Sequence, residues 1–398
     1  MSNTVARLEG GREDSRERFD EVRQRRRDGR VTSSWLGRHV GRIERDGSNT
    51  VPLITAGDVR SMIDGCDVWD MWPLALPDGS PAPVSGGTLW MFLAAPRHDD
   101  PGLRHDHARI WLFLRRDARW IDCGPLLPEG FSPGSREWSG SAVLDPETGE
   151  ATLFFTAAGR REGGPRFEQR LFQTRGRLDV DSERPRLVGW SAPTESVAAD
   201  DEIYRRTATA EAAPGLIKGF RDPGYFRDPA DGASYLLFTA SRAGSRHSYD
   251  GVIGVARATV ADGLGGWRLE PPLIDADGLC NEMERPHIIL REGLYYLFWS
   301  SQASVFSPGG PAGLTGLYGA VSESFRGEWR PLNGSGLVLA NPPMAPAQAY
   351  CWWVTPDLSV ISFVDQWRTG EAPDATAFGG TAAPLLRLTL DGDRSSLV

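Results

Sequence analysis

Five short apolar runs of similar composition constrain the fold of this chain more than any other feature. Each is six residues of mainly aromatic and aliphatic side chains, which is typical of a buried β-strand. The central phenylalanines are 63, 83, 60 and 65 residues apart, and each interval can hold about four short strands with their loops. The runs are 89–94, 152–157, 235–240, 295–300 and 360–365, marked by Phe92, Phe155, Phe238, Phe298 and Phe363.

This spacing predicts an all-β fold, a five-bladed β-propeller in which inner strands converge on a central, funnel-shaped active site. A β-sandwich with similar strands is the alternative. The 398 residues suffice for one such large domain. We assign residues 46–398 to the catalytic propeller. Residues 1–45 are expected to form a charged N-terminal arm, partly helical or disordered, because they offer few apolar side chains to bury.

Charge and composition limit the partners. The formal net charge of −9 repels phosphate backbones, which argues against nucleic acid and permits a neutral sugar. No run is long enough to span a membrane, and no secretory signal is visible, so we expect a cytoplasmic protein with no membrane partner, although export by another route stays open. Lys218 is the only lysine, a bias that we attribute to base composition.

Neither a metal nor a cofactor is predicted. The cysteines show no ligand or redox spacing and are expected to be free, buried thiols; they are Cys66, Cys123, Cys280 and Cys351. His105 and His107 would share one face of a strand, but without further ligands a solvated loop or strand edge is favoured over a metal site.

The first acidic motif is Val68-Trp69-Asp70-Met71-Trp72-Pro73. The rings of Trp69 and Trp72 could provide a stacking face for a sugar and exclude water from Asp70. A carboxylate in such surroundings can attack an anomeric carbon and form a covalent glycosyl-enzyme. Taken alone, the motif fits equally well an Asp that caps a turn before Pro73.

The second motif is Glu282-Met283-Glu284-Arg285-Pro286. Alternate residues of a strand face the same way, so both carboxyls would enter one site, where crowding of like charges favours a proton on one of them. Glu284 would then protonate a leaving group, while Glu282 bonds sugar hydroxyls and Arg285 supports the cluster. A surface cluster of Glu–Arg pairs is the alternative.

A third carboxyl comes from Arg221-Asp222-Pro223. Asp222 would grip ring hydroxyls more tightly as positive charge develops on the sugar, which makes it a transition-state stabiliser. A near copy, Arg227-Asp228-Pro229, precedes Ala-Asp-Gly and is interpreted as a turn.

In their order along the chain, 68–73, 221–223 and 282–286, the motifs resemble those of glycoside hydrolase family 68, the levansucrases, inulosucrases and bacterial β-fructofuranosidases. Their motifs read approximately V-W-D-x-W-P, R-D-P and D/E-x-E-R. The similarity spans most of the chain from about residue 50 and includes 137–142 and 167–172.

The resemblance implies a retaining enzyme that cleaves sucrose and passes the fructosyl group to water or a short sugar acceptor. By motif match, Asp70 is the nucleophile, Asp222 the transition-state stabiliser and Glu284 the acid/base. The substrate-binding residues expected on this basis, with Arg285 and Gln302 added from the neighbouring sequence, are Trp69, Trp138, Ser139, Arg221, Glu282, Arg285, Gln302 and Tyr350.

Several positions depart from the family pattern. Gln302 stands where polymer-forming members often carry Arg or His, which argues against long-chain fructan synthesis. Asn281 replaces an Asp of calcium-binding members, which weakens any case for a hard cation. Cys351, after Tyr350, could reshape the pocket rim. An intracellular fructosyltransferase with a non-sucrose donor or acceptor, and a catalytically silent sugar-binding propeller, are the alternative functions.

Overall fold

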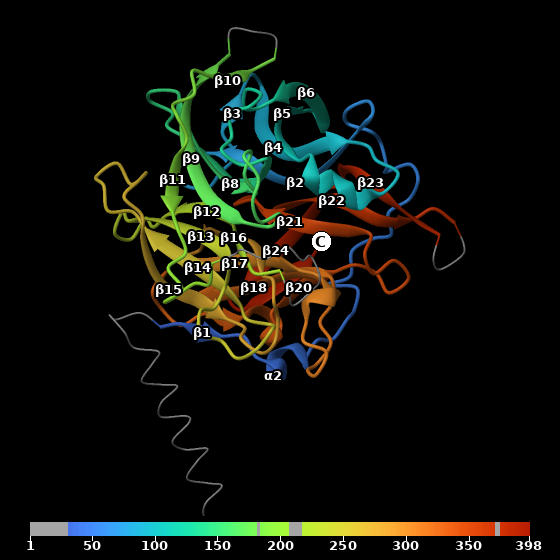
Figure 1. Cartoon of the computed structure of the whole chain (residues 1–398). Coiled ribbons are helices and arrows are strands. Elements are labelled where there is room, and N and C mark those ends of the chain that lie inside the picture. The colour runs from blue at the N-terminus through green and yellow to red at the C-terminus, as the bar shows by residue number, and fades with distance from the viewer. Residues whose placement is uncertain (1–30, 181–183, 207–216, 371–374) are drawn as a thin grey trace, which may run out of the picture.

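The structure, a computed structural model, describes residues 31–180, 184–206, 217–370 and 375–398. Within this part of the chain, five blades of mainly antiparallel strands surround a central axis and follow one another in chain order, so that the last blade lies beside the first (Figure 1). The predicted five-bladed, all-β propeller is confirmed.

The blades take their strands in sequence. They are blade one, β2 (Cys66–Ala75), β3 (Pro83–Val84), β4 (Gly87–Pro96), β5 (Arg109–Arg116) and β6 (Arg119–Pro125); blade two, β7 (Arg136–Leu144), β8 (Glu150–Ala158), β9 (Gln169–Asp179), β10 (Arg186–Val188) and β11 (Thr194–Val197); blade three, β12 (Phe220–Arg227), β13 (Ser234–Ser241), β14 (Gly251–Arg257) and β15 (Arg268–Asp275); blade four, β16 (Glu284–Arg291), β17 (Leu294–Ser301), β18 (Gly316–Ser322), β19 (Arg330–Pro331) and β20 (Leu337–Ala340); and blade five, β21 (Ala349–Val354), β22 (Ser359–Arg368), β23 (Thr376–Ala382), β24 (Leu386–Asp391) and β25 (Arg394–Leu397).

The five apolar runs form the strand that pairs with the innermost strand of each blade: β4, β8, β13, β17 and β22. All five marker phenylalanines are buried, with at most 2% of their surface exposed. Burial of each such ring stabilises the fold by roughly 1.5–3 kcal/mol. The run spacing therefore reflects one strand in the same place in every blade.

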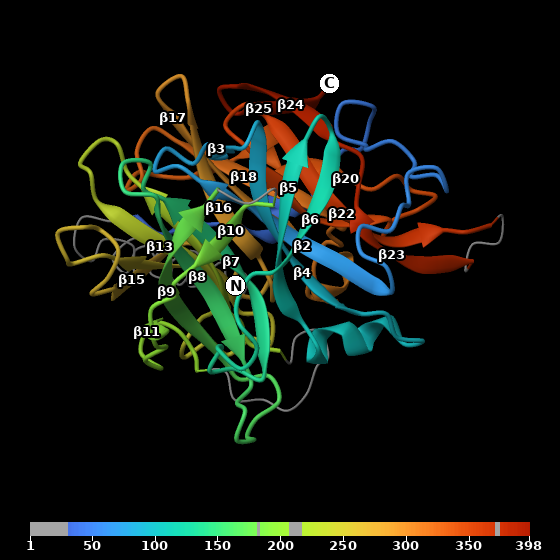
Figure 2. The same ribbon diagram turned by 90° about the horizontal axis from the view of Figure 1, so that it is seen from above.

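Residues 48–51, which precede blade one in the chain, help to close the ring of blades. Leu397 N–H donates to Ser48 O, and Val51 N–H to Ala340 O, so this segment contacts blades four and five before it enters blade one. Blades one and two are joined directly, because β2 and β7 pair in parallel with Leu74 opposite Ala142. Both strands lie near the middle of the molecule in the view from above (Figure 2).

Part of the predicted arm can be placed. Residues 1–30 lie outside the described residues, whereas 31–45 contain β1 (Ser33–Ser34) and α2 (Gly37–Val40). β1 extends blade three by pairing with β15. The buried ring of Trp35 packs against Trp299 and Tyr318 of blade four, at centroid distances of 5.3 and 4.9 Å. Residues 33–40 thus contact two blades. The remaining short helices are η1 (Pro101–Asp106), η2 (Ala303–Val305) and η3 (Leu332–Gly334).

Each innermost strand carries a register shift of the kind a β-bulge produces. The shifts fall at Trp69/Met71 in β2, Trp138/Gly140 in β7, Arg221/Gly224 in β12, Glu284/His287 in β16 and Tyr350/Trp353 in β21. Bulges re-aim side chains and often lie beside active sites. Four of them hold a non-glycine residue with positive φ: Asp70 (42°), Asp222 (61°), Arg285 (56°) and Cys351 (52°). Since such conformations cost of order 1–3 kcal/mol each, their recurrence at one level of the ring indicates a function.

The bulges also explain two proline-containing motifs. Pro223 and Pro286 directly follow the positive-φ residues Asp222 and Arg285. Proline has no N–H to give to a ladder, so within sheets it is confined to edges and bulges. The Arg-Asp-Pro and Glu-Arg-Pro sequences therefore mark backbone irregularities as well as carboxyl groups.

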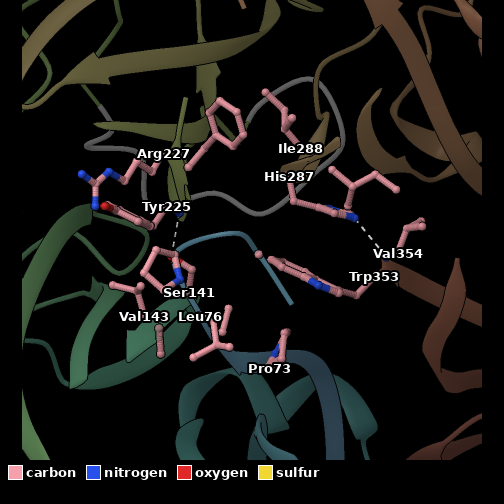
Figure 3. A pocket seen from close by; sticks show the side chains of 16 residues that line it. Pro73, Leu76, Ser141, Val143, Tyr225, Arg227, His287, Ile288, Trp353 and Val354 are labelled. Carbon is pink, nitrogen blue, oxygen red and sulfur yellow. Dashed lines mark hydrogen bonds between the residues drawn. The ribbon is translucent and has the colours of Figure 1, made fainter. Parts of the chain in front are cut away.

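The inner strands enclose a pocket of about 40 Å³, which is lined by residues that follow the bulges along each strand (Figure 3). His287 joins two blades beside it. Its Nδ1 lies 3.0 Å from Arg285 O, and its Nε2 accepts from Val354 N–H at 3.0 Å, so the imidazole is neutral with the proton on Nδ1. Burial lowers the pKa of His287 to about 3. Its ring stacks on Trp353 at 4.2 Å.

Replacing His287 with phenylalanine should therefore destabilise the propeller without removing the ring stacking. The change leaves the buried Val354 N–H and Arg285 carbonyl without partners, which we expect to cost about 2–4 kcal/mol. Urea unfolding of both proteins measures the difference. A free energy of unfolding equal to that of the wild type would contradict this role for His287.

Candidate active site

The five bulges surround one cavity of about 420 Å³, within the range of small-molecule sites. Every inner strand contributes to its wall. The sequence-predicted residues that line it are Trp69, Asp70, Trp138, Ser139, Arg221, Asp222, Glu282, Glu284, Gln302 and Tyr350. The three carboxyls predicted to carry the chemistry therefore share a single cavity. Their individual roles stay predictions.

Asp70 lines the cavity, and its side chain is 18% exposed. Burial raises the pKa of its carboxyl to about 6, against an opposing effect of the guanidinium of Arg285, whose Nη1 is 3.9 Å from Asp70 Oδ1. The thiol of Cys351 also hydrogen-bonds Asp70. Asp70 is thus a carboxyl of raised pKa whose oxygens are contacted by the guanidinium of Arg285 and the thiol of Cys351.

Arg285 is the one predicted substrate-binding residue that does not line the cavity. It is 3% exposed and lies 5.5 Å from the Trp72 ring and 5.6 Å from that of Trp353. It donates a hydrogen bond to the backbone carbonyl of Met71. The expectation that Trp72 forms a sugar-stacking face is wrong, because its ring is completely buried under the site against Arg285.

Asp222 is held on both carboxylate oxygens. Ser139 Oγ donates to Oδ1 at 2.6 Å, and Thr239 Oγ1 lies 3.0 Å from Oδ2. Its backbone N–H donates to Thr156 Oγ1 at 2.9 Å. Burial raises the pKa of Asp222, and Arg221 beside it acts in the opposite direction. These bonds fix the carboxylate in one orientation, which suits a group that must meet ring hydroxyls at fixed places.

Glu282 and Glu284 both enter the cavity, although only Glu284 belongs to a strand; Glu282 lies in the preceding loop. One nitrogen of Arg221, Nη2, donates to Glu282 Oε2 at 2.6 Å and Glu284 Oε1 at 2.7 Å. Tyr350 Oη donates to the other oxygen of Glu284. Burial raises the pKa of Glu282, and it also raises the pKa of Tyr350 well above its usual value, with the Glu284 charge adding to the effect.

The near copy of the third motif is a turn, as predicted. Asp228 follows the end of β12 and accepts the N–H of Ala230 at 3.0 Å and the hydroxyl of Tyr295 at 2.7 Å.

The prediction that the four cysteines are free, buried thiols is only half right. All four cysteines are free, but Cys66 and Cys123 are partly exposed.

Several cavity residues were not assigned to the site from the sequence, among them Arg104, His105, Arg166 and Asp365. Cys351 was placed at the rim, yet it touches Asp70. Asp365 ends the fifth apolar run, where the others end in Ala or Ser, and this break in the pattern is a signal that could have found it. Burial raises its pKa to about 6, with Arg104 opposing. Arg104 lies in η1 and had no sequence signal.

Among the described residues, no three His, Cys, Asp or Glu side chains are grouped so that they could hold a metal ion. In that same part of the chain, no helix has the length and apolar character needed to cross a membrane.

The raised pKa of Asp70 predicts a pH-dependent stability cost. Between its ordinary value of 3.8 and about 6, the folded state binds a proton that the unfolded chain releases, so stability falls as pH rises through this window. Asp70→Asn removes the buried charge. We expect it to be more stable than the wild type at pH 8, by up to about 3 kcal/mol, and equal to it near pH 4. Thermal unfolding at the two pH values measures this; a difference independent of pH would contradict it.

In this propeller, two aspartates and a glutamate line one cavity together with an arginine and two indole rings. This fold and site define a glycoside-processing enzyme. Residues 25–251 and 247–398 match the model of the Levansucrase/Invertase family, and the chain belongs to that family.

Its relatives support this assignment. The chain is 34% identical over 394 residues to levansucrase Lscbeta of Pseudomonas syringae pv. actinidiae, covering 88% of this chain and 87% of that protein. It is 33% identical over 387 residues to an extracellular sucrase of Zymomonas mobilis, covering 90% and 91%. Among solved structures, the inulosucrase of Halalkalicoccus jeotgali bound to kestose is 37% identical with a TM-score of 0.83, covering 92% and 95%.

Proposed function

We propose that this enzyme cleaves sucrose with retention of configuration, releasing glucose and passing the fructosyl group to water or a short sugar acceptor. The observation that carries the proposal is the convergence of Asp70, Asp222 and Glu284 on one cavity in a member of the Levansucrase/Invertase family. A catalytically silent sugar-binding propeller is not favoured, because the relatives named above are a levansucrase, a sucrase and an inulosucrase.

The first half-reaction breaks the bond between the fructosyl anomeric carbon and the glucosyl oxygen. Asp70 attacks that carbon as Glu284 gives its proton to the departing oxygen, so that glucose leaves neutral and the fructosyl group is esterified to Asp70. Tyr350 and Arg221 hold the two oxygens of Glu284 during this step.

In the second half-reaction, Glu284 takes a proton from water or a sugar hydroxyl, whose oxygen displaces Asp70 from the anomeric carbon. Positive charge develops on the fructosyl ring in both steps, and the oriented Asp222 carboxylate stabilises it. On the acceptor side, Gln302 would favour short products over a long polymer.

Asp222→Asn should test the stabiliser role, with Asp228→Asn as a matched control from the neighbouring Arg-Asp-Pro copy. Loss of the negative charge beside the ring should reduce kcat by about a hundred- to a thousandfold, while the KM for sucrose changes less. The control carboxyl lies in a turn outside the cavity, so its loss should leave kcat within about threefold of the wild type.

Initial rates of glucose release measure both variants, and counting fructose separately gives the share transferred to sugar. Equal kcat values for the two variants would refute the role of Asp222. Absence of glucose release by the wild type would refute the proposed function itself.

A further inference from the structure

The ammonium of Lys218, the only lysine in the chain, is surrounded by a shell of oxygens, and its neighbour in the chain, Ile217, lines the cavity. Its Nζ donates to Ser248 O at 2.5 Å and Asp250 Oδ1 at 2.9 Å, and lies 3.4 Å from Asn281 Oδ1. Asp250 is completely buried, and the Lys218 side chain is only 12% exposed. The other oxygen of Asp250, Oδ2, lies 3.3 Å from Nε of Arg205, so Lys218 is one of two cations that compensate this buried carboxylate.

This shell is connected to the acidic wall of the cavity. The amide nitrogen of Asn281 donates to Ile217 O at 2.7 Å and lies 3.3 Å from Glu282 Oε1. The other oxygen of Glu282 accepts from Arg221, whose same nitrogen reaches Glu284. A continuous path of polar contacts therefore runs from the ammonium to the proposed acid/base.

Three loops meet at the ammonium. Lys218 precedes β12, which carries Asp222; Asp250 precedes β14; and Asn281 precedes β16, which begins at Glu284. The main chain adds one further link, since Gly251 N–H donates to Cys280 O at 2.9 Å. A single cation thus ties the loop before the stabiliser strand to the loop before the acid/base strand.

We propose that Lys218 is a positioning residue whose tethered ammonium serves as a resident cation, fixing the amide of Asn281 and, through it, the orientation of Glu282 against Arg221. The inference rests on the proposed function, because its readout is sucrose cleavage. Small misplacements of catalytic groups reduce turnover strongly.

Lys218→Met keeps the apolar stem and removes the charge. We expect kcat/KM for sucrose per folded molecule to fall roughly ten- to a hundredfold. Asn281→Leu breaks the path while leaving the ammonium on Asp250, and should give a similar loss. The double variant should lose little more than either single one, because both changes interrupt the same path. Arg242→Met removes another ion pair of blade three, with Asp275 at 2.7 Å, and should leave kcat/KM unchanged.

A second experiment separates positioning from packing. Lys218→Ala leaves space and keeps the three oxygens, so potassium or methylammonium chloride should restore kcat/KM in a saturable way. Choline chloride at the same ionic strength is too large to enter and should not. Should Lys218→Ala not fold, the same salts are tested on Lys218→Gly, and failure of both to fold in saturating potassium would count against a replaceable cation.

The inference is overturned if Lys218→Met retains wild-type kcat/KM per folded molecule, if the double variant loses the product of the two single losses, or if potassium and choline act alike. These results are distinguishable from failure of the proposed function, since in each of them the wild type still releases glucose from sucrose.

Discussion

Asp70→Ala is expected to abolish turnover, lowering kcat for glucose release from sucrose by about four orders of magnitude or more. In the proposed mechanism Asp70 forms the covalent bond to the fructosyl group, and no neighbouring group can replace it without moving, because Asp222 and Glu284 are each tied on both carboxylate oxygens. Binding should persist, since the rest of the cavity wall is intact. Isothermal titration with sucrose and glucose-release rates measure the two effects separately.

Asp67→Asn provides the matched control for this variant. Asp67 lies on the same strand, is 4% exposed, and pairs with Arg97 at 3.0 Å, but it does not line the cavity. We expect its loss to change stability slightly and kcat by less than about threefold. If Asp70→Ala retained more than about a hundredth of wild-type kcat, Asp70 would not be the nucleophile.

Glu284→Gln is expected to reduce kcat on sucrose by about three to four orders of magnitude, because glucose is a poor leaving group without a proton from the enzyme. Fructosyl fluoride needs no such proton, so release of fluoride in the first turnover should be nearly normal. The fructosyl-enzyme should then accumulate, because the acceptor lacks its general base. A rapid-quench measurement of the fluoride burst tests this.

The control for this effect is Glu137→Gln. Glu137 is a buried glutamate on the inner strand β7, and its Oε2 accepts the N–H of Ile110 at 2.8 Å, outside the cavity. An amide oxygen can accept the same bond, so activity on both substrates should be retained. Equal losses on sucrose and on the fluoride by Glu284→Gln would show that Glu284 binds substrate and does not transfer protons.

The blade repeat was predictable because a strand buried on both faces needs a continuous apolar run, and Phe92, Phe155 and their counterparts mark the same strand in each blade. The convergence of the carboxyls followed from the propeller geometry. Pro223 and Pro286 are signs of two of the bulges, but the others were not predictable, since a period-two pattern gives no sign of a residue with positive φ such as Asp70. They decide which side chains enter the cavity, which is why Trp72 was misplaced.

Contacts between loops far apart in the chain could not be predicted from the sequence either. Lys218 and Asn281 are separated by 63 positions and have no shared motif, so their proximity depends on the order of the blades. Arg104 comes from a short helix whose place over the cavity depends on tertiary packing. Asp365 could have been found, because it replaces a small residue at the end of an otherwise apolar run.

The covalent intermediate is the most direct test of the central claim that three carboxyls act together on one fructosyl group. Glu284→Gln should be incubated with fructosyl fluoride, quenched in acid, digested and examined by mass spectrometry. We predict one fructosyl unit, attached to Asp70 in the peptide that contains Trp69-Asp70-Met71. Fluoride release with no adduct, or an adduct on any other residue, would contradict the mechanism.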